Sequence, residues 1–536
     1  MKKDLVKLFL DKGILISPDF IENVPEESYE EFILSLDNLD QNIVYINEDV
    51  YEGVKNNKVN DIKWGEFEKS RVLFEKGVKN NYEEFINEFR IEITSNEKLD
   101  VTKKELIIKN QGISISIKKD FQIIKQYSEN VKKRCVDDFV AYFRYRYNFL
   151  KDLLLQRIEL QEALSISRVL NKEEGESVSV IGLIKDKRVT KNGHIILILE
   201  EMSGEINALI TKNSPHFEAA QDLVLDEIIG VTGSVGKDII FVREFYIPDV
   251  PVSNEVKKSS EEEYVVFTSD VHVGSKMFFR DNFLKFIDWL NGKYGSGEQR
   301  KISKKVKYLF IVGDLVEGVG IYPGQENDLD VMDIYDQYED FTKLIDKIRK
   351  DIQIIIIGGN HDALRLSEPQ PVIDHEIAKS LYQLENVIFL TNPGVVQIGA
   401  KENFPGFSIL LYHGFSFPYY AEEVESIRKA GRLDRCDLIM KFLLQRRHLA
   451  PSHQSTLYIP DPDIDSLIID KVPDFFISGH IHKLAVSNYR GVTMINSGCW
   501  IDQTDYQEKQ GMVPDPNKVP IVNLKTREVK ILNFED

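Results

Sequence analysis

Five apolar runs in the C-terminal half of the chain each end in a polar cluster of Asp, Asn, His and Gly. The runs are YVVFTSD, KYLFIVGD, IQIIIIGGNHD, SILLYHG and FFISGHIH. Runs that are apolar on both faces are typical of strands buried on both sides, as in an α/β sheet or a two-sheet sandwich covered by helices. Residues beyond the carboxyl ends of such strands converge, and glycine lets a ligand approach closely. The pattern therefore predicts one site built from all five strand ends.

The residues at these ends have the chemistry of metal ligands. The candidate ligands are Asp270, His272, Asp314, Asn360, His413, His480 and His482. Carboxylate and imidazole without thiolate suit divalent ions such as manganese, iron or zinc. We expect two divalent metal ions, with Mn²⁺ as the first choice and iron or zinc as the alternatives.

The spacing suggests how the ligands are shared. Asp270 and His272 lie two residues apart, so both can face one ion from an extended segment, and the last two histidines repeat this spacing. Asp314 has two oxygens and can bridge ions that lie ~3.5–4 Å apart. Asn360 offers a neutral oxygen, and His413 completes the second ion. Such a pair of ions generates a hydroxide nucleophile and stabilises the charge that develops on phosphorus oxygens.

His361 follows a ligand directly and can point at a substrate instead. We expect it to be the catalytic residue, a general acid that protonates the leaving alkoxide. Asp362 is expected to orient its neighbours rather than to bind metal. A lone DxH or HxH is common and usually carries no function. Here five clusters occur in one order, and they hold five of the 10 histidines, which chance placement does not readily produce.

The chain has 536 residues, too many for one hydrophobic core, so several domains are expected. Residues 1–60 show apolar positions at helical spacing and predict a small helical N-terminal domain. Residues 61–135 are rich in Lys, Glu and Asn and read as a linker or variable segment, with weak strand patterns at 89–94 and 112–117. Residues 136–170 predict a connecting helix. Its aromatic residues and arginines favour a core-facing stripe opposite a solvated face.

Residues 171–250 change period to five short β-rich runs separated by Gly, Asn and Ser turns, which predicts an OB-type barrel. Such a barrel binds single strands or serves as a docking module, and the pattern does not choose between them. The polar segment 251–263 reads as a boundary. Residues 264–536 then form the domain that carries the site.

Charge and cysteine content limit the partners and the compartment. The net charge is −19, whereas a protein that grips nucleic acid alone is usually basic, so DNA binding would need a local patch or a partner. The three cysteines form no CxxC pair, which argues against disulfides and cysteine-ligated zinc. No run is long enough for a membrane helix, and no continuous apolar signal region opens the chain. We expect a cytoplasmic protein without membrane association.

The clusters D-x-H, G-D, G-N-H-D, H-G and G-H-x-H, in this order, resemble those of the calcineurin-like metallophosphoesterases over residues 264–500. Further stretches resemble the small subunits of archaeal family-D DNA polymerases over essentially the whole chain, most weakly over residues 1–130. These stretches include FVAYFRYRYNFL, GDLVEGVGIYPGQ, RRHLAPSHQ and NSGCWIDQTDYQEKQGMVPDP. The resemblance implies a multidomain protein: a small α-helical N-terminal domain, an OB-type β-barrel and an α/β phosphoesterase domain built as a four-layer, two-sheet sandwich.

The same resemblance implies a function. It implies a 3′–5′ proofreading exonuclease that hydrolyses phosphodiesters with two metals, acts on DNA with a 3′ end, and forms a heterodimer with a large catalytic polymerase subunit. A sliding clamp would be contacted only indirectly. The small subunits of eukaryotic replicative polymerases are similar in architecture but have lost the metal ligands, whereas this chain keeps them. The alternatives are a non-catalytic assembly scaffold and a stand-alone metallophosphoesterase.

Three smaller features leave their roles open. The sequence after His413 is Gly-Phe-Ser-Phe, where the family resemblance would suggest a polar or basic residue after the glycine, and this affects local substrate contacts. The segment with Tyr322, Pro323 and Gln325 could shape a loop over the site or simply end a turn. DNA-phosphate contacts or structural salt bridges are both compatible with Arg446, Arg447 and His448.

Overall fold

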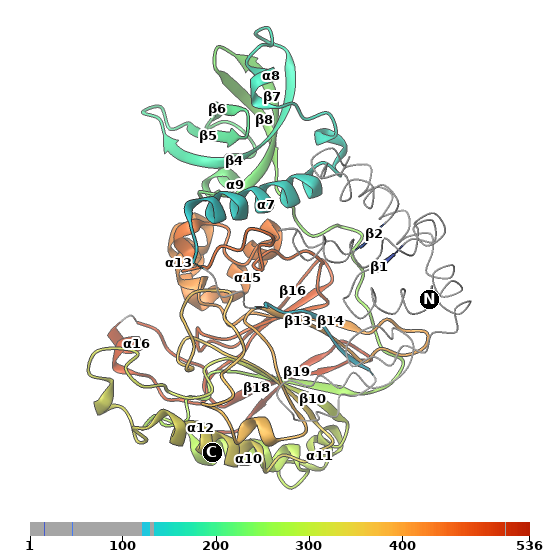
Figure 1. The fold of residues 1–536 in the computed structure, drawn as a ribbon, viewed down its shortest axis with the longest axis vertical. Coiled ribbons are helices and arrows are strands. Elements are labelled where there is room, and N and C mark those ends of the chain that lie inside the picture. Colours follow the sequence, from blue (N-terminus) through green and yellow to red (C-terminus); the bar gives the residue numbers. More distant parts are fainter. Residues whose placement is uncertain (1–14, 17–44, 47–119, 129–132, 510, 536) are drawn as a thin grey trace, which may run out of the picture. The chain divides into compact units, whose positions relative to one another are not determined.

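The computed structural model describes residues 15–16, 45–46, 120–128, 133–509 and 511–535 (Figure 1). The chain divides into two compact units, Met1–Lys103 and Lys104–Asp536. The barrel and the candidate site both belong to the second unit.

The first unit contains one described strand pair. β1 (Leu15–Ile16) runs parallel to β2 (Tyr45–Ile46), a pairing that the helical domain expected at residues 1–60 did not include. The helices expected in that domain, and the strand candidates at 89–94 and 112–117, lie outside the described residues.

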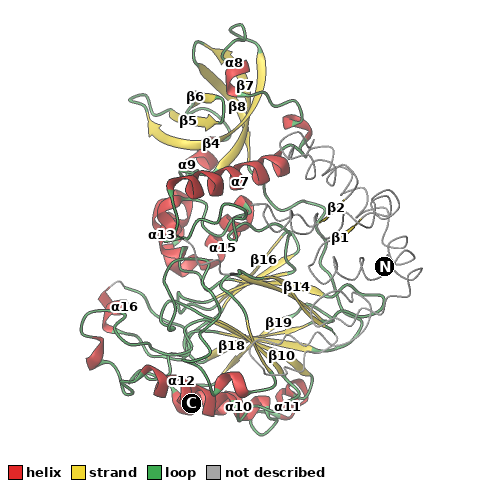
Figure 2. Ribbon diagram, viewed as in Figure 1, coloured by secondary structure: helices red, strands yellow, loops and turns green. Residues whose placement is uncertain are grey.

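Two six-stranded sheets form the C-terminal domain (Figure 2). The first sheet has the order β12-β11-β10-β9-β18-β19. Its strands are β9 (Tyr264–Thr268), β10 (Val306–Val312), β11 (Gln353–Ile357), β12 (Val387–Phe389), β18 (Lys518–Asn523) and β19 (Val529–Asn533). Strands β9 to β12 are parallel, β18 pairs antiparallel with β9, and β19 pairs antiparallel with β18.

The second sheet has the order β16-β17-β15-β14-β13-β3. Its strands are β3 (Phe121–Lys125), β13 (Gly394–Ile398), β14 (Phe407–Leu411), β15 (Phe475–Ser478), β16 (Ala485–Tyr489) and β17 (Val492–Asn496). Strand β3 precedes the barrel in the chain yet pairs with β13. The segment 61–135 is therefore not linker throughout, because Phe121 is buried between the two sheets.

Helices cover the outer face of each sheet. They are α10 (Arg280–Leu290), α11 (Gly297–Ser303) and α12 (Ile334–Ile345) on the first sheet, and α13 (Phe417–Glu423), α14 (Glu425–Ala430) and α15 (Cys436–Arg446) on the second. Alternate residues of β9 face the two sides: Val266 packs against helices, while Val265 and Phe267 pack between the sheets. The four-layer, two-sheet sandwich is thereby confirmed.

The OB-type barrel is also confirmed. Five strands close in the order β4-β5-β6-β8-β7, with α9 (Phe217–Gln221) between β6 and β7. The strands are β4 (Ser177–Val189), β5 (Ile195–Glu201), β6 (Gly204–Ile210), β7 (Ile228–Gly236) and β8 (Ile239–Tyr246). Alternate residues of β5, namely Ile195, Leu197 and Leu199, fill the interior.

The helix expected over residues 136–170 is shorter in the structure. Helix α7 (Val136–Leu154) ends before a 3-10 turn, η3 (Ile158–Leu160), and a short helix, α8 (Ile166–Val169). Leu160 is fully buried in a small core with barrel residues, so the chain folds back onto the barrel instead of continuing the helix.

A buried polar cluster ties α7 to the sandwich. Arg146 Nε lies 2.7 Å from Asp465 Oδ2, and the Tyr142 hydroxyl donates to Asp465 Oδ1 at 2.7 Å. His448 Nε2 lies 2.9 Å from the same carboxylate. Removing one partner of such a buried pair typically costs about 3–5 kcal/mol.

Among the described residues, no helix has the length and apolar content that crossing a bilayer requires.

Candidate metal centre

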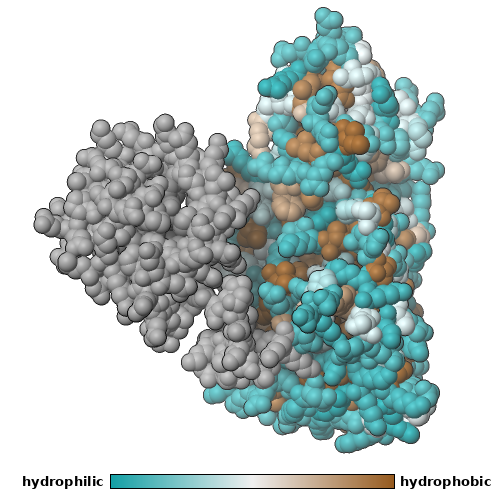
Figure 3. Space-filling model, turned by 90° about the vertical axis from the view of Figure 1, so that its right-hand side faces the viewer, coloured by the Kyte–Doolittle hydropathy of each residue, from teal (hydrophilic) through white to brown (hydrophobic). Residues whose placement is uncertain are grey.

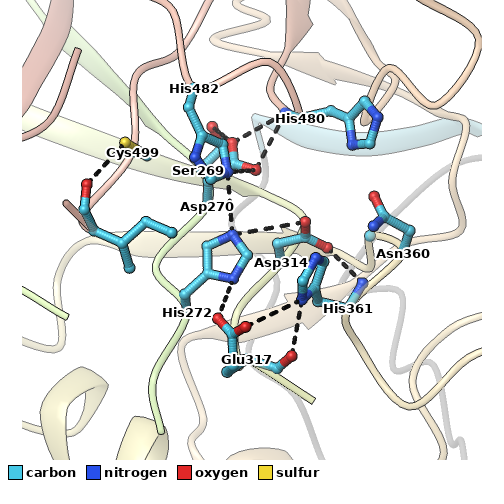
Figure 4. A network of polar contacts seen from close by, with 12 residues as sticks. Ser269, Asp270, His272, Asp314, Glu317, Asn360, His361, His480, His482 and Cys499 are labelled. Carbon is cyan, nitrogen blue, oxygen red and sulfur yellow. Dashed lines mark hydrogen bonds and ion pairs between the residues drawn. The ribbon is translucent and has the colours of Figure 1, made fainter. Parts of the chain in front are cut away.

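The polar clusters at the five strand ends meet in one place (Figure 4). Three of the strands, β9, β10 and β11, are neighbours in the first sheet, and the other two, β14 and β15, are neighbours in the second. The seven candidate ligands come from these ends: Asp270, His272, Asp314, Asn360, His413, His480 and His482. The site therefore lies at one edge of the sandwich and draws on both sheets.

One group of ligands forms around Asp270. Its Oδ1 lies 3.5 Å from His482 Nε2, and that nitrogen lies 3.2 Å from His272 Nε2. These three residues are buried, and their donor atoms lie within reach of one ion.

A second group forms around His413. Its Nε2 lies 3.2 Å from Asp314 Oδ2 and 3.1 Å from Asn360 Oδ1, and its ring centroid lies 5.1 Å from that of His480. The two histidines of the GHIH motif thus separate: His482 joins the first group and His480 the second.

Asp314 connects the two groups. Its Oδ2 lies 3.2 Å from His413 Nε2 in the second group and 3.8 Å from His272 Nε2 in the first. Its Oδ1 accepts the backbone N–H of His361 at 2.8 Å. The residue that the sequence suggested as a bridge lies between the two donor sets.

The backbone at the site takes an uncommon conformation. Asp270, His272, Asp314, His480 and His482 all have positive φ values, between 52° and 69°. Non-glycine residues adopt this left-handed region rarely, and strain of this kind concentrates at functional sites. Dense packing surrounds these residues: a Cβ added at Gly359 would come within 2.2 Å of Asp314 Oδ1, so the loop approaches this carboxylate closely.

The donor set fits divalent cations. His413 Nδ1 lies 2.8 Å from the carbonyl oxygen of Val312, so Nδ1 carries a proton and donates it. In the neutral ring, the Nε2 lone pair then faces the oxygens of Asp314 and Asn360. Three lone pairs that converge on one point call for a proton or a metal cation between them, and nitrogen and oxygen donors suit Mn²⁺, Fe²⁺ or Zn²⁺.

The charges within the site are strongly coupled. Burial raises the pKa of Asp314, but the charges of His413 and His361 outweigh it and hold that pKa well below the usual value. Burial lowers the pKa of His413, but Asp314 raises it to about 9. Burial and the neighbouring His413 charge lower the pKa of His480 to about 3. Near neutral pH the carboxylate of Asp314 is therefore ionised and the ring of His480 is neutral, the forms that bind metal, whereas His413 holds a proton that a bound cation would displace.

Glu317 is a site residue that sequence reasoning missed. Its Oε2 accepts from His272 Nδ1 at 2.9 Å, which directs the Nε2 lone pair of that ring toward Asp270 and His482. Carboxylates in this position orient metal-binding histidines and raise their basicity. The one signal in the sequence was an acidic residue three positions after Asp314, between apolar residues and a glycine in the stretch GDLVEG.

His361 lies beside the ligands with one ring nitrogen occupied. Its Nδ1 lies 2.8 Å from the carbonyl oxygen of Glu317 and 3.8 Å from Glu317 Oε1. Its ring packs edge-on against His272, with 4.6 Å between centroids. The Nδ1–H is therefore donated to the backbone, and Nε2 is the nitrogen left to face a substrate.

Asp362, the neighbour of His361, makes structural contacts. Asp362 accepts the N–H of Gly359 at 2.8 Å and the Tyr338 hydroxyl at 3.0 Å, and burial followed by the charge of Asp314 raises its pKa to about 7. It therefore shapes the loop that carries Asn360 and His361, as the sequence suggested.

The segment after Glu317 forms a loop beside the site. Gln325 is buried, accepts the N–H of Ile321 at 2.9 Å and donates to the Glu317 carbonyl at 3.1 Å. The Tyr322 hydroxyl donates to Asp328 at 3.0 Å, while Pro323 is exposed. Of the two possibilities left open, these contacts favour a loop that is anchored at the site.

The residues proposed to contact DNA phosphates do not lie on the surface. Arg446 pairs with Glu227 of the barrel at 3.1 Å, and Arg447 donates to the carbonyls of Ile469 and Asp470. His448 is fully buried against Asp465. The prediction that these residues contact DNA is therefore corrected: they have the structural role that the sequence left equally open. Each of the three side chains makes its hydrogen bonds or ion pairs inside the fold.

Family models match both domains. One for calcineurin-like phosphoesterases matches residues 264–484, and one for OB-fold nucleic acid binding domains matches residues 178–250. The first range covers β9 to β15 and the five strand ends of the site, and the second covers the closed barrel.

Relatives match most of the chain. The DNA polymerase II small subunit of Methanothermobacter thermautotrophicus is 40% identical over 77% of this chain and 83% of its own. That of Pyrococcus furiosus is 37% identical over 74% of this chain and 64% of its own. That of Halobacterium salinarum is 37% identical over 74% of this chain and 75% of its own.

Solved structures resemble parts of the chain only distantly. An archaeal phosphodiesterase is 14% identical, covers 50% of this chain and 98% of its own, and has a TM-score of 0.24. An asparaginyl-tRNA synthetase from Pyrococcus horikoshii is 20% identical over 16% of this chain and 21% of its own, with a TM-score of 0.15. Scores this low add nothing to the assignment, which rests on the geometry and the sequence relatives.

Proposed function

The chain belongs to the family of archaeal DNA polymerase II small subunits, and from that premise we propose that it is a 3′–5′ exonuclease subunit. The proposed substrate is DNA with a 3′ end, and the proposed reaction is metal-dependent hydrolysis of the terminal phosphodiester. The proposed setting is a heterodimer with a large polymerising subunit, where the activity would remove misincorporated nucleotides.

The observation that carries the proposal is the pair of donor groups joined by Asp314. One group would hold the first ion through Asp270, His272 and His482, and the other would hold the second through Asn360, His413 and His480, with Asp314 between them. We expect Mn²⁺ in both positions, with iron or zinc as alternatives. When bound, two such ions supply a nucleophile from water at neutral pH and positive charge against the phosphate oxygens.

The chain's own residues supply the proton that the leaving group needs. In hydrolysis that releases a nucleotide, the bond from phosphorus to the 3′ oxygen of the remaining strand breaks, and that oxygen takes up a proton. His361 is the proposed donor through Nε2, because its Nδ1–H is fixed on the carbonyl of Glu317. The Glu317 carboxylate, with Oε1 3.8 Å from Nδ1, lies on the same side of the ring and helps to hold its orientation.

The retained donor set argues against the alternative of a vestigial scaffold. A domain that only holds an assembly together has no need of five strained left-handed residues and a buried histidine–carboxylate cluster. The match over both the barrel and the sandwich argues against a stand-alone phosphoesterase.

Substitution of His361 tests the proposal. We expect His361→Ala to lower the rate of nucleotide release by about 10²–10⁴-fold, the usual contribution of a general acid, while manganese binding stays near the wild-type level. The measurement is the shortening of a 5′-labelled single strand, with calorimetric titration of Mn²⁺ beside it. His375→Ala, at a histidine whose ring nitrogen lies by Glu376, is the matched control. Near-normal turnover in the His361 variant would remove the general-acid assignment.

A further inference from the structure

The site residues differ in their exposure to solvent. Asp270, Asp314 and His413 are at most 1% exposed, whereas Asn360, His361 and His480 are partly exposed. A phosphodiester therefore reaches the metal ligands past these last three residues, and side chains beside them are the ones that meet the rest of the substrate.

An aromatic ring stands at this mouth. Phe415 follows His413 and Gly414, and its ring centroid lies 5.6 Å from that of His480. The side chain is partly exposed and belongs to none of the hydrophobic cores of the described residues. Its neighbour Phe417 is fully buried in the core between α13, α15 and the second sheet. Packing thus accounts for Phe417 but not for Phe415.

The backbone that carries Phe415 is fixed on both sides. The N–H of Ser416 donates to the Tyr412 hydroxyl at 3.1 Å, and the Ser416 hydroxyl donates to the carbonyl of Leu449 at 2.7 Å. The carbonyl of His413 accepts the N–H of Gly479 at 2.9 Å. A ring on such a rigid backbone loses little conformational entropy when a flat ligand packs on it.

A second apolar wall lies beside His361. Val319 and Ile321 are 48% and 38% exposed, and a Cβ added at Gly318 would come within 2.3 Å of the carbonyl oxygen of His361. The loop is held by the Gln325 side chain, which accepts the N–H of Ile321. The mouth is therefore apolar next to both the proton donor and the second ligand group, which suits flat, apolar nucleobases better than phosphates.

We propose that Phe415 stacks on the base of the 3′-terminal nucleotide and thereby selects ends that are unpaired. The inference rests on the proposed exonuclease function and names the substrate feature that the same site reads. A base in a duplex is paired and stacked on its neighbour, so only a frayed terminal nucleotide can bring its phosphate to the ligands and its base to the ring. Stacking on an aromatic ring tolerates every base, as removal of any misincorporated nucleotide requires.

The test compares a normal 3′-terminal nucleotide with an abasic one in the same single strand. Phe415→Ala should lower kcat/KM about 5- to 150-fold on the normal strand, the range for loss of one stacked base, mostly through KM. On the abasic strand, the variant and the wild-type chain should be alike. Phe415→Tyr should retain wild-type behaviour on both strands, and Phe241→Ala, at a 48% exposed phenylalanine on the barrel, is the matched control.

A binding readout separates this inference from the proposed function. A strand with 2-aminopurine at its 3′ end is mixed with full-length His361→Ala protein, alone and with its large subunit, and base fluorescence is measured. Loss of this quenching in the His361→Ala, Phe415→Ala double variant supports stacking, whether or not the wild-type chain releases nucleotides. Absence of nucleotide release would contradict only the proposed exonuclease function. Equal quenching with and without the ring, or equal loss of kcat/KM on normal and abasic strands, would overturn the stacking proposal.

Discussion

Asp314 shows how much a single residue contributes to this site. Its two carboxylate oxygens contact a backbone N–H of the GNHD loop and histidines of both donor groups. Its place at the end of an apolar run was predictable, because a strand of that composition must be buried and must stop at Gly-Asp. Its left-handed backbone was not predictable, since φ at a loop residue depends on what the loop packs against.

Glu317 is the residue that the pattern at the strand ends did not predict. It lies in the loop after β10, and its role depends on the distance to His272, which lies 45 positions earlier in the chain. A single acidic residue in a loop is ordinarily a solvated charge, so only the fold distinguishes it from its exposed neighbour Glu326.

Substitution of Glu317 should weaken metal binding. Glu317→Gln removes the charged acceptor for His272 Nδ1, and loss of such a partner typically lowers metal affinity or activity about 10–100-fold. Isothermal titration with Mn²⁺ measures the affinity directly. Glu326→Gln, in the same loop but exposed, should behave as the wild-type chain. An unchanged affinity in the Glu317 variant would mean that this carboxylate does not orient the histidine.

At the scale of elements, the strands that carry the site were predictable and their partners were less so. Continuous apolar runs predicted β9, β10, β11, β14 and β15. Strand β3 was not predicted as a sheet member, because its five residues stand in a polar region and its partner β13 lies more than 260 positions away. The end of α7 was also not predicted. No glycine or proline marks it in the sequence, and the chain turns there because Leu160 packs against the barrel.

The cluster that anchors α7 should make stability depend on pH. Burial and then the charge of Arg146 lower the pKa of His448 from its ordinary 6.5 to about 4. Between pH 6.5 and about 4, the imidazole is protonated in the unfolded chain but neutral in the folded one. The contribution of the neutral buried ring to the free energy of unfolding is therefore complete above about pH 6.5 and is lost as the pH falls toward 4. The full loss is on the order of 3 kcal/mol.

Urea unfolding at pH 7 and pH 5 checks this dependence. His448→Gln should flatten the change in unfolding free energy between the two pH values, whereas His375→Gln should leave it as in the wild-type chain. If the His448 variant lost as much stability on acidification as the wild type, the buried imidazole would not be the titrating group.

For the whole molecule, surface and charge bear on how DNA reaches the site: the described face in Figure 3 is mostly hydrophilic, and the chain has a net charge of −19. Phosphate neutralisation by basic residues supplies most non-specific DNA affinity, and an acidic chain opposes it. We therefore expect a positively charged channel in the large subunit to deliver the 3′ end. The two domains and their architecture followed from period and turn residues, but the partner surface does not follow from either.

DNA binding by the chain alone should accordingly be weak. At physiological salt we expect the complex with the large subunit to bind a single strand at least about ten-fold more tightly than the isolated chain does. Fluorescence anisotropy at two salt concentrations measures both affinities and their salt dependence. Equally tight binding by the isolated chain would show that the acidic subunit carries its own DNA site.

In the proposed function, hydrolysis of DNA from its 3′ end depends on the donor groups that Asp314 joins. The most direct measurement follows a 5′-labelled single strand with the purified chain in Mn²⁺, in EDTA, and with Asp314→Asn in Mn²⁺. We expect a ladder of strands shortened one nucleotide at a time in the first case and an intact strand in the other two. A strand that stays intact with the wild-type chain in Mn²⁺, alone and with the large subunit, or a ladder that persists with Asp314→Asn, would contradict it.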